Sequence, residues 1–304
     1  MPDALLTRLE WTVLKRLDGW LQGDYRTLLR GNGLDLADLR EYQHHDDVRR
    51  IDWNVTARLQ QPYVREYTED RELAAWFLLD LSPSVDFGSR VRKRSVSAAF
   101  VGTLARALTR HGNRVGALLY GNAVDTVVPA RGGRRHVLHL LHRLQTRAAA
   151  SAAGGTRLAD LLAHAAGAIG RRAAVFVVSD FISEPGWERP LAELARRHDV
   201  VAVRLYDPLE MKLPALGMVL MQDAETGEQL FVDTGARGFR QRYEQLAAQR
   251  EQELLTTLAR AGVDTLELTT DDDLADAILR FAGARKQRAR LAAGAVSAKQ
   301  KAAA

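Results

Sequence analysis

The stretch Leu73–Ser84 constrains the fold more than any other part of this chain. Seven consecutive apolar residues lead into Asp80, and Pro83 follows three residues later. An apolar run of this length, stopped by a turn, is typical of a strand buried on both faces of a parallel sheet, although a short buried helix gives a similar run. Ligands of open α/β sheets bind just beyond the carboxyl ends of the strands. The sequence therefore predicts a ligand site immediately after this strand.

Three oxygen-bearing side chains mark the end of the run at a spacing of two. Asp80, Ser82 and Ser84 offer one carboxylate and two hydroxyls, and we expect all three in the loop beyond the strand. Hard cations such as Mg²⁺ bind oxygen ligands in near-octahedral geometry at about 2.1 Å, so the pattern favours a cation site. In the alternative, Asp80 caps a turn and the serines accept hydrogen bonds from N–H groups of the loop.

The pattern resembles the first motif of the von Willebrand factor A fold, in which it opens a metal-ion-dependent adhesion site. That family also requires a lone Thr at the start of a helix and an Asp at the end of a further strand. Here Thr156 follows two glycines and precedes a helix-like run, and Asp180 closes the apolar stretch Ala173–Ser179. All three parts of the pattern occur in the expected order and context, which makes the resemblance specific.

The resemblance implies a metal site with a defined division of roles. Ser82 and Ser84 bind the metal directly, Thr156 binds it directly or through water, and the two aspartates often act through water. The implied ligands are Asp80, Ser82, Ser84, Thr156 and Asp180, and the implied cofactor is Mg²⁺, with Mn²⁺ or Ca²⁺ as alternatives. Hydroxyl ligands supply little formal charge, so the metal can accept a carboxylate from an Asp or Glu of a protein partner.

Strands and helices alternate along the rest of the chain. Apolar runs predict strands at Val115–Tyr120, Ala173–Ser179, Val200–Tyr206 and Val263–Leu268. Apolar spacing predicts helices at Ser95–Arg110, His136–Thr146, Arg157–Ile169, Trp187–Arg197, Arg237–Ala261 and Asp271–Phe281, the last capped by Asp271 or Asp272. Two hairpins are expected, one with Val124–Val128 as an antiparallel edge and one formed by Met218–Met221 and Leu230–Val232. This alternation predicts an α/β fold with right-handed crossovers and a mostly parallel sheet. Together with the resemblance described above, it implies a von Willebrand factor A-like fold, doubly wound with helices on both faces.

The segment before the sheet carries a second pattern. It contains Arg40-Glu41-Tyr42, Asp46-Asp47, Arg50-Ile51-Asp52-Trp53, Ala57-Arg58 and Glu69-Asp70. This order resembles that of bacterial proteins catalogued as domain of unknown function fifty-eight, and the resemblance runs over about residues 21–281. One departure is His44-His45, where members of that family commonly have Pro-Gly. The residues that we expect to contact a partner are Arg40, Asp47, Arg50, Asp52, Trp53 and Arg58.

Two other interpretations of this segment stay open. Its acidic and basic side chains could form a buried Arg–Asp network, with Trp53 in the core. The cluster at His44–Asp47 could bind zinc or iron, although adjacent residues of a strand point to opposite faces and chelate poorly together.

We expect three regions along the 304 residues, namely an extension at 1–70, the sheet domain at 71–282 and a disordered, basic, Ala-rich tail at 283–304. The tail carries six basic residues and no acid, and removing them from the net charge of +5 leaves the other 282 residues at −1. Nucleic-acid binding is therefore not favoured. The chain has no cysteine, no signal-peptide core and no apolar run near the roughly 20 residues of a membrane span, which together indicate a cytoplasmic protein.

These observations predict a non-enzymatic protein-binding module that depends on Mg²⁺. The second resemblance implies an adaptor or assembly factor that works with a separate AAA+ ATPase of the MoxR type, because members of that family are often encoded beside such ATPases. The alternative is a metal-dependent phosphoryl-transfer or hydrolytic enzyme that uses the same acidic cleft. Against it, no His, Glu or Lys except Glu184 lies within a few residues of Asp80, Thr156 or Asp180, so a general base is missing.

Overall fold

The computed structural model describes residues 39–42, 51, 53–65, 74–147, 155–285 and 287–288. These residues fall into two compact units, one within Gly31–Leu73 and the other from Ala74 onward. In the smaller unit, β1 (Leu39–Glu41) pairs antiparallel with β2 (Tyr63–Arg65), and α3 (Trp53–Leu59) lies between them in the sequence. The Tyr63 N–H donates a hydrogen bond to the hydroxyl of Thr56, which ties the helix to the second strand.

The larger unit is built on a six-stranded sheet. Its strands are β3 (Ala74–Asp80), β4 (Arg114–Tyr120), β5 (Val124–Arg131), β6 (Ala174–Ser179), β7 (Asp199–Tyr206) and β10 (Asp264–Thr269). They lie in the order β10-β7-β6-β3-β4-β5, and all neighbours are parallel except β5, which runs antiparallel to β4. The apolar run before Asp80 is thus a central strand, and the predicted fold class is confirmed.

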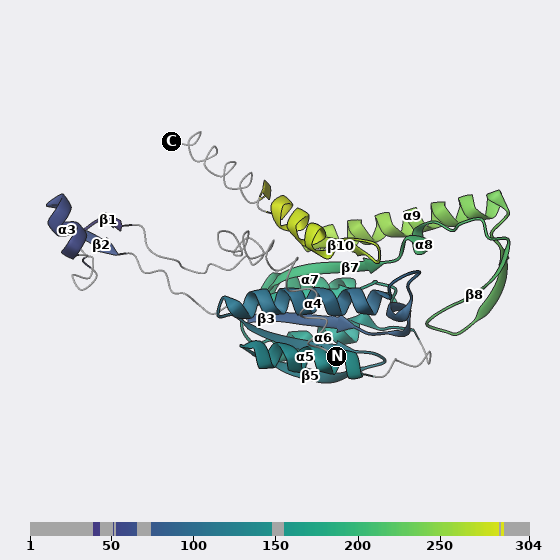
Figure 1. Ribbon diagram of the computed structural model, residues 1–304, viewed down its shortest axis with the longest axis horizontal. Coiled ribbons are helices and arrows are strands. Elements are labelled where there is room, and N and C mark those ends of the chain that lie inside the picture. The colour runs from purple at the N-terminus through teal and green to yellow at the C-terminus, as the bar shows by residue number, and fades with distance from the viewer. Residues whose placement is uncertain are drawn as a thin grey trace. The chain divides into compact units, whose positions relative to one another are not determined.

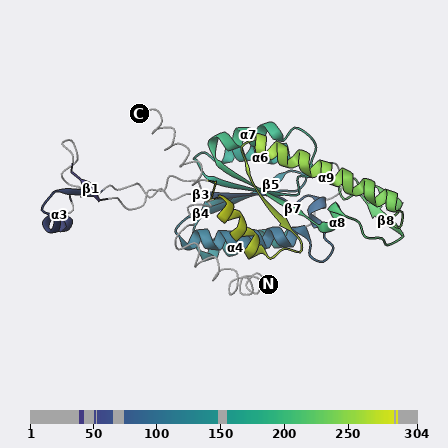
Figure 2. The ribbon, with the colours of Figure 1, turned by 90° about the horizontal axis from the view of Figure 1, so that it is seen from above.

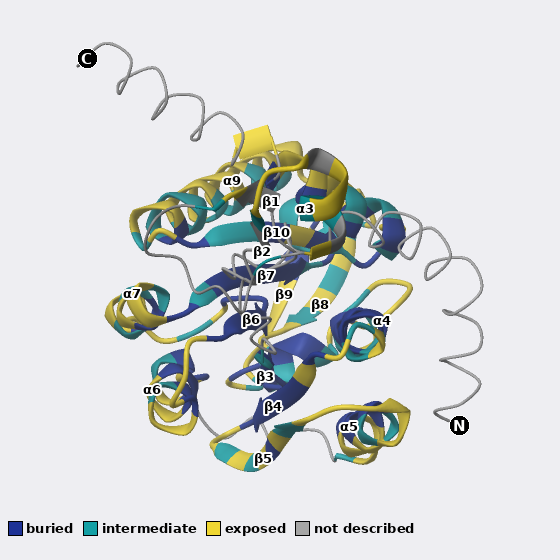
Figure 3. Cartoon of the chain, turned by 90° about the vertical axis from the view of Figure 1, so that its left-hand side faces the viewer, coloured by how far each residue is buried: buried dark blue, intermediate teal, exposed yellow. Residues whose placement is uncertain are grey.

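Helices cover both faces of this sheet (Figure 3). The helices on one face are α4 (Lys93–Arg110) and α5 (Arg134–Thr146), and those on the other are α6 (Leu158–Ala168) and α7 (Glu188–Arg197). The strand β3 serves both faces because its side chains alternate. The ring centroids of Phe77 and of Phe100 in α4 lie 6.4 Å apart, whereas Trp76 and Leu78 pack with α6 and α7. This two-sided burial explains why the strand is apolar throughout.

The strand order reverses next to β3. From β3 the chain crosses through α4 to β4 on one side, and the later strands β6, β7 and β10 lie on the other side. The carboxyl ends of β3 and β6 therefore flank the topological switch point, where doubly wound sheets bind ligands. The last residues of these two strands are Asp80 and Ser179.

A hairpin and a long helix extend from the sheet (Figures 1 and 2). After β7 come α8 (Pro208–Met211), β8 (Met218–Gln222), β9 (Gln229–Asp233) and α9 (Arg237–Arg260). The strands β8 and β9 pair antiparallel, as their turn sequence predicts. Their turn contains Gly227 with a φ of +76°, a conformation that favours glycine. Figure 1 shows the hairpin bending back from the start of α9 toward one end of the sheet.

The last helix of the structure covers residues 274–285 and 287–288. Asp273 caps it, because its Oδ1 accepts hydrogen bonds from the N–H groups two and three residues further on. The predicted cap at Asp271 or Asp272 is wrong, since Asp272 instead accepts a hydrogen bond from the Thr269 N–H.

The tail boundary that the sequence predicts at residue 283 falls inside this helix. Arg285 is only 2% exposed, and its guanidinium donates to Asp264 at 2.7 Å and also pairs with Asp199. These two aspartates are the first residues of β10 and β7. The folded domain therefore continues at least to Arg285.

Replacing Arg285 by Ala should destabilise the protein by about 3 kcal/mol, because two aspartates lose a buried partner. Arg288→Ala is the matched control, since this residue also pairs with Asp264, at 2.8 Å, but has a side chain that is 54% exposed. Exposed pairs contribute about 1 kcal/mol or less. Urea denaturation measures both variants, and equal free energies of unfolding would contradict a structural role for Arg285.

Candidate functional site

Asp80 is the buried centre of the candidate site. It is the last residue of β3 and is fully buried, so the expectation that it lies in the loop beyond the strand is wrong. Its Oδ1 accepts a hydrogen bond from the Ser82 N–H at 3.0 Å, and its Oδ2 accepts one from the Ser179 hydroxyl at 2.6 Å. Burial, and then the charge of Asp180, raise the pKa of Asp80 to about 6, while these hydrogen bonds lower it. A carboxylate in such a position is stabilised by a nearby cation.

The two serines lie at the start of a single turn of 3-10 helix. The element η3 (Pro83–Asp86) begins directly after Ser82, and Pro83 suits its first position because a helix start has no partner for that N–H. Both serines are buried, and their hydroxyl oxygens lie 3.2 Å apart. The spacing of two thus brings the hydroxyls of Ser82 and Ser84 side by side.

Thr156 is connected to the serines through a residue that the sequence did not single out. It lies two residues before α6 and is buried. Its hydroxyl donates to Oε2 of Glu225 at 2.8 Å, and the Ser84 N–H donates to Oε1 of the same carboxylate at 3.1 Å. Glu225 comes from the turn between β8 and β9 and is 8% exposed. One carboxylate therefore bridges the loop after β3 and the segment before α6.

Asp180 follows β6 and is paired with a buried cation. Its Oδ2 accepts a hydrogen bond from the Lys93 ammonium at 2.7 Å, and its Oδ1 accepts one from the Ile182 N–H at 3.1 Å. Lys93 is fully buried at the start of α4 and also donates to Glu210 of α8 at 2.5 Å. Burial alone lowers the pKa of Lys93, but the charges of Asp180 and Glu210 raise it, so the ammonium stays charged. Phe181, next in the chain, has a φ of +54°, a conformation uncommon for a residue with a Cβ.

The structure brings the five predicted ligands to one edge of the sheet and adds four polar residues to them. Ser179, Lys93, Glu210 and Glu225 complete the hydrogen-bond network. Apart from Glu184, no His, Glu or Lys lies near these ligands in the sequence, but in the structure Lys93 and Glu225 both contact predicted ligands. Their partners are 87 and 141 residues away, so no local pattern marks either residue.

The donor arrangement could hold a hard divalent cation. Ligands at about 2.1 Å in neighbouring octahedral positions lie about 3.0 Å from each other. The hydroxyl oxygens of Ser82 and Ser84 are 3.2 Å apart, close to this separation. The hydroxyl of Thr156 lies 2.8 Å from Oε2 of Glu225. In the part of the chain that the structure describes, no three His, Cys, Asp or Glu side chains form a metal site by themselves, so a cation here would depend on the hydroxyls.

The charges of the site also suit a cation. The carboxylates of Asp180 and Glu210 share the ammonium of Lys93, while Asp80 and Glu225 are held by neutral donors. Negative charge therefore exceeds positive charge within this cluster, and a divalent ion would offset the excess.

The residues predicted to contact a partner belong to the smaller unit. Arg40 lies in β1, and Trp53 and Arg58 lie in α3 with exposed side chains. Trp53 is 68% exposed, which argues against the interpretation that places it in the core. The remaining residues of this prediction, Asp47, Arg50 and Asp52, lie outside the described residues, as does the rest of the cluster at His44–Asp47.

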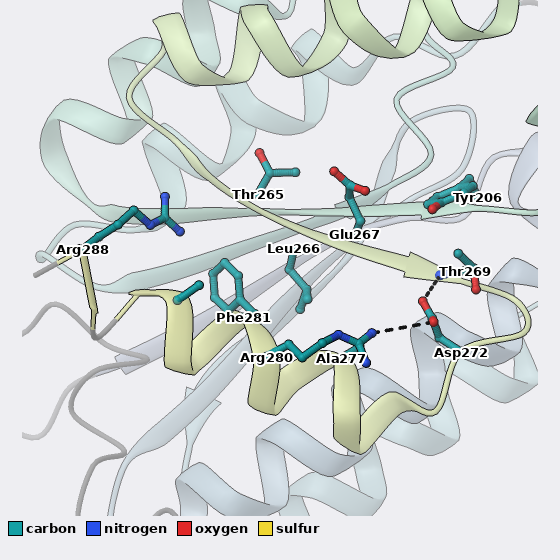
Figure 4. Close-up of a pocket in the computed structure, with 11 residues that line it drawn as sticks. Tyr206, Thr265, Leu266, Glu267, Thr269, Asp272, Ala277, Arg280, Phe281 and Arg288 are labelled. Atoms are coloured by element: carbon teal, nitrogen blue, oxygen red, sulfur yellow. Dashed lines mark hydrogen bonds and ion pairs between the residues drawn. The ribbon is translucent and has the colours of Figure 1, made fainter.

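A pocket of about 430 Å³ lies elsewhere, between β10 and the last helix (Figure 4). Asp272 connects two other lining residues of this pocket. Asp272 accepts a hydrogen bond from the Thr269 N–H at 2.9 Å and lies 3.8 Å from the guanidinium of Arg280. Since none of the five predicted ligands lines this pocket, we do not assign it the function of the switch-point site.

The fold is a von Willebrand factor A-like α/β sheet, and an oxygen-rich cluster lies at its switch point. The chain matches the family described as "Protein of unknown function DUF58" over residues 38–253, and it belongs to this family. It is 37% identical over 289 residues to an uncharacterized protein of Mycobacterium tuberculosis, covering 94% of this chain and 90% of the relative. An uncharacterized protein of Mycobacterium avium is 34% identical over 164 residues, covering 54% of this chain and 96% of that relative.

Solved structures with a similar chain path include an aerotolerance-related membrane protein from Bacteroides fragilis. It shares 13% identity and a TM-score of 0.47, over 69% of this chain and 98% of that chain. A von Willebrand factor type A protein from Catenulispora acidiphila shares 14% identity and a TM-score of 0.33, over 47% of this chain and 35% of that chain. Within the described ranges of the present chain, no helix combines the length and the apolar character needed to cross a membrane.

Lys93→Met should destabilise the protein by about 3 kcal/mol, because the substitution leaves the buried carboxylate of Asp180 without its cation. Arg92→Met is the control, since this neighbouring residue loses the same charge from an exposed position. Thermal and urea denaturation should separate the two variants clearly. A Lys93→Met protein as stable as the Arg92→Met protein would mean that Asp180 needs no charged partner.

Proposed function

We propose that this protein is a non-enzymatic module that binds a protein partner through Mg²⁺. The observation that carries the proposal is the convergence of three separate segments at the switch point of the sheet. These segments supply Asp80, Ser82, Ser84, Thr156 and Asp180. In the cell, the module would act in the cytoplasm as an adaptor or assembly factor with a MoxR-type AAA+ ATPase. The family resemblance supports this partner, which would be a separate chain.

Each side chain has a defined task in this proposal. The hydroxyls of Ser82, Ser84 and Thr156 provide neutral oxygens, and Asp80 and Asp180 provide negative charge around them. Asp80 also fixes the loop, because it accepts the Ser82 N–H while Ser179 holds its other oxygen. When bound, Mg²⁺, or Mn²⁺ or Ca²⁺ in its place, supplies an electrophilic centre that attracts a carboxylate.

The chemistry of the surroundings favours a partner that offers an Asp or Glu. The Ser84 N–H and the Thr156 hydroxyl already bind a carboxylate, that of Glu225. The nearby arginines do not add to this preference, because Arg147 pairs with Asp125, and Arg157 lies 3.8 Å from Asp160 and 3.7 Å from Glu184.

The rival function is a metal-dependent phosphoryl-transfer or hydrolytic enzyme. Lys93 and Glu225 could supply acid–base groups for it. However, the Lys93 ammonium is paired with two carboxylates, and both oxygens of Glu225 already accept hydrogen bonds. Groups that are fully engaged in this way support a binding role more than a catalytic one.

Isothermal titration with MgCl₂ tests the metal. We expect the parent to bind Mg²⁺, and Thr156→Val and Asp80→Asn to bind it at least about tenfold more weakly, because each loses an oxygen or a charge next to the ion. Thr103→Val is the control, since it removes a buried hydroxyl of α4 outside this cluster. Equal Mg²⁺ affinity in parent and Thr156→Val would overturn the metal assignment.

Binding to a purified MoxR-type ATPase from the same organism tests the partner. The parent and Thr103→Val should bind the immobilised ATPase in MgCl₂ and dissociate from it in EDTA. Thr156→Val should bind the ATPase only weakly in either buffer. Binding that is unchanged by EDTA would contradict a metal-mediated contact. Hydrolysis of a simple phosphate ester by the parent, lost in Thr156→Val, would support the rival enzyme instead.

A further inference from the structure

The candidate site is closed in this structure. Each of the five predicted ligands is at most 3% exposed, so an acidic side chain of another protein has no open path to them. Glu225 contacts two of these residues, because its carboxylate bridges the Ser84 N–H and the Thr156 hydroxyl. A carboxylate of this chain thus occupies the place that the proposed function reserves for a partner.

The turn between β8 and β9 is built to present this one side chain. Oδ1 of Asp223 accepts hydrogen bonds from the N–H groups of Glu225 and Thr226, both at 2.8 Å, and the Asp223 N–H donates to the Glu228 carbonyl at 2.8 Å. Gly227 provides the positive φ that the turn needs. Of residues 223–228, Glu225 is the buried one, so the turn contacts the site through its carboxylate.

The rest of the hairpin is weakly held. Four large apolar side chains on its strands are at least 50% exposed, namely Met218, Leu220, Leu230 and Phe231. Val232 is the buried side chain of the two strands, and the base of the hairpin is fixed where the Thr234 N–H and hydroxyl donate to the Gly217 carbonyl. Two-stranded hairpins are marginally stable by themselves. The contact of Glu225 therefore contributes a large share of what keeps the tip in place.

We propose that Glu225 is an internal ligand of the switch-point site, which an acidic side chain of a partner must displace before it can bind. This inference rests on the proposed function, since it assumes that the site takes a carboxylate from outside. A ligand on the same chain acts at an effective concentration on the order of millimolar, so it outcompetes a free acidic peptide at micromolar concentration. Withdrawal of the tip opens the site without unfolding the sheet, because the hairpin lies outside the six strands.

A peptide-binding experiment tests this displacement. The probe is a fluorescent synthetic peptide with the sequence of residues 218–233, and a second peptide carries Gln in place of the Glu at position 225. Both are titrated in MgCl₂ against the full-length parent, Glu225→Gln and Glu228→Gln. Glu228→Gln is the matched control, because it removes the same charge from an exposed position of the same turn.

We expect Glu225→Gln to bind the acidic peptide at least about tenfold more tightly than the parent and Glu228→Gln do. In this variant, the Glu225 carboxylate no longer occupies the site in competition with the peptide. The affinity of the Gln-containing peptide should be the same for the parent and for Glu225→Gln. Melting temperatures check that the variants fold, and Glu225→Ala serves as a second variant if Gln still holds the tip. Equal affinity of parent and both Glu225 variants for the acidic peptide, or no binding to any of them, would overturn the internal-ligand inference.

The outcomes also separate this inference from the proposed function. If EDTA leaves the tighter binding by Glu225→Gln unchanged, the result supports Glu225 as an internal ligand and contradicts the requirement for Mg²⁺. If the ATPase binds the parent and Glu225→Gln equally in MgCl₂ and binds neither protein in EDTA, the result supports the proposed function and contradicts the internal-ligand inference.

Discussion

The burial of the Asp80 carboxylate at the end of the central strand is the constraint on which the rest of the site depends. A buried carboxylate is costly unless it is hydrogen-bonded or paired. Here one oxygen accepts the Ser82 N–H, which fixes the loop after β3, and the other accepts the Ser179 hydroxyl, which joins the ends of β3 and β6. Asp180 lies close enough to raise the cost further, and this explains why a lysine is buried beside it. The electrostatics of one residue therefore set the positions of several others.

The polar contacts that stabilise these buried charges continue from Lys93 across the carboxyl edge of the sheet. Glu210 binds the ammonium with one oxygen and accepts the Asp207 N–H with the other, at 3.1 Å. Asp207 is fully buried, and hydrogen bonds from Ser89 and Thr270 hold its pKa below the usual value although burial alone raises it. The loop before α4, the end of β7 and the segment after β10 are thus joined by polar contacts. A rigid edge of this kind can keep donors in place for a ligand.

Local sequence patterns predicted what local physics determines. The apolar run ending at Asp80 identified the central strand, and the alternation of elements identified the doubly wound sheet. The roles of Lys93 and Glu225 could not be predicted, because their contacts join residues far apart in the sequence and follow from the crossovers and the hairpin. The same holds for Arg285, whose basic neighbours made it look like part of a tail although its two aspartates lie at the starts of distant strands. The prediction of the cap of the last helix was wrong for a different reason. Three consecutive aspartates are equivalent candidates in the sequence, and only the backbone geometry selects Asp273.

The internal carboxylate has a consequence for how affinity and selectivity would arise. A partner that replaces Glu225 by its own acid makes nearly the same contacts with Ser84 and Thr156, so the exchange at the site is close to neutral in free energy. Net affinity must then come from contacts outside the cluster, such as those with the exposed apolar side chains of the released hairpin. Because coupling between two equilibria is reciprocal, whatever favours release of the hairpin also favours partner binding, and a bound partner keeps the hairpin displaced. Under the proposed exchange, the cluster would select for an acidic side chain, while the surface around it would determine how tightly the partner binds.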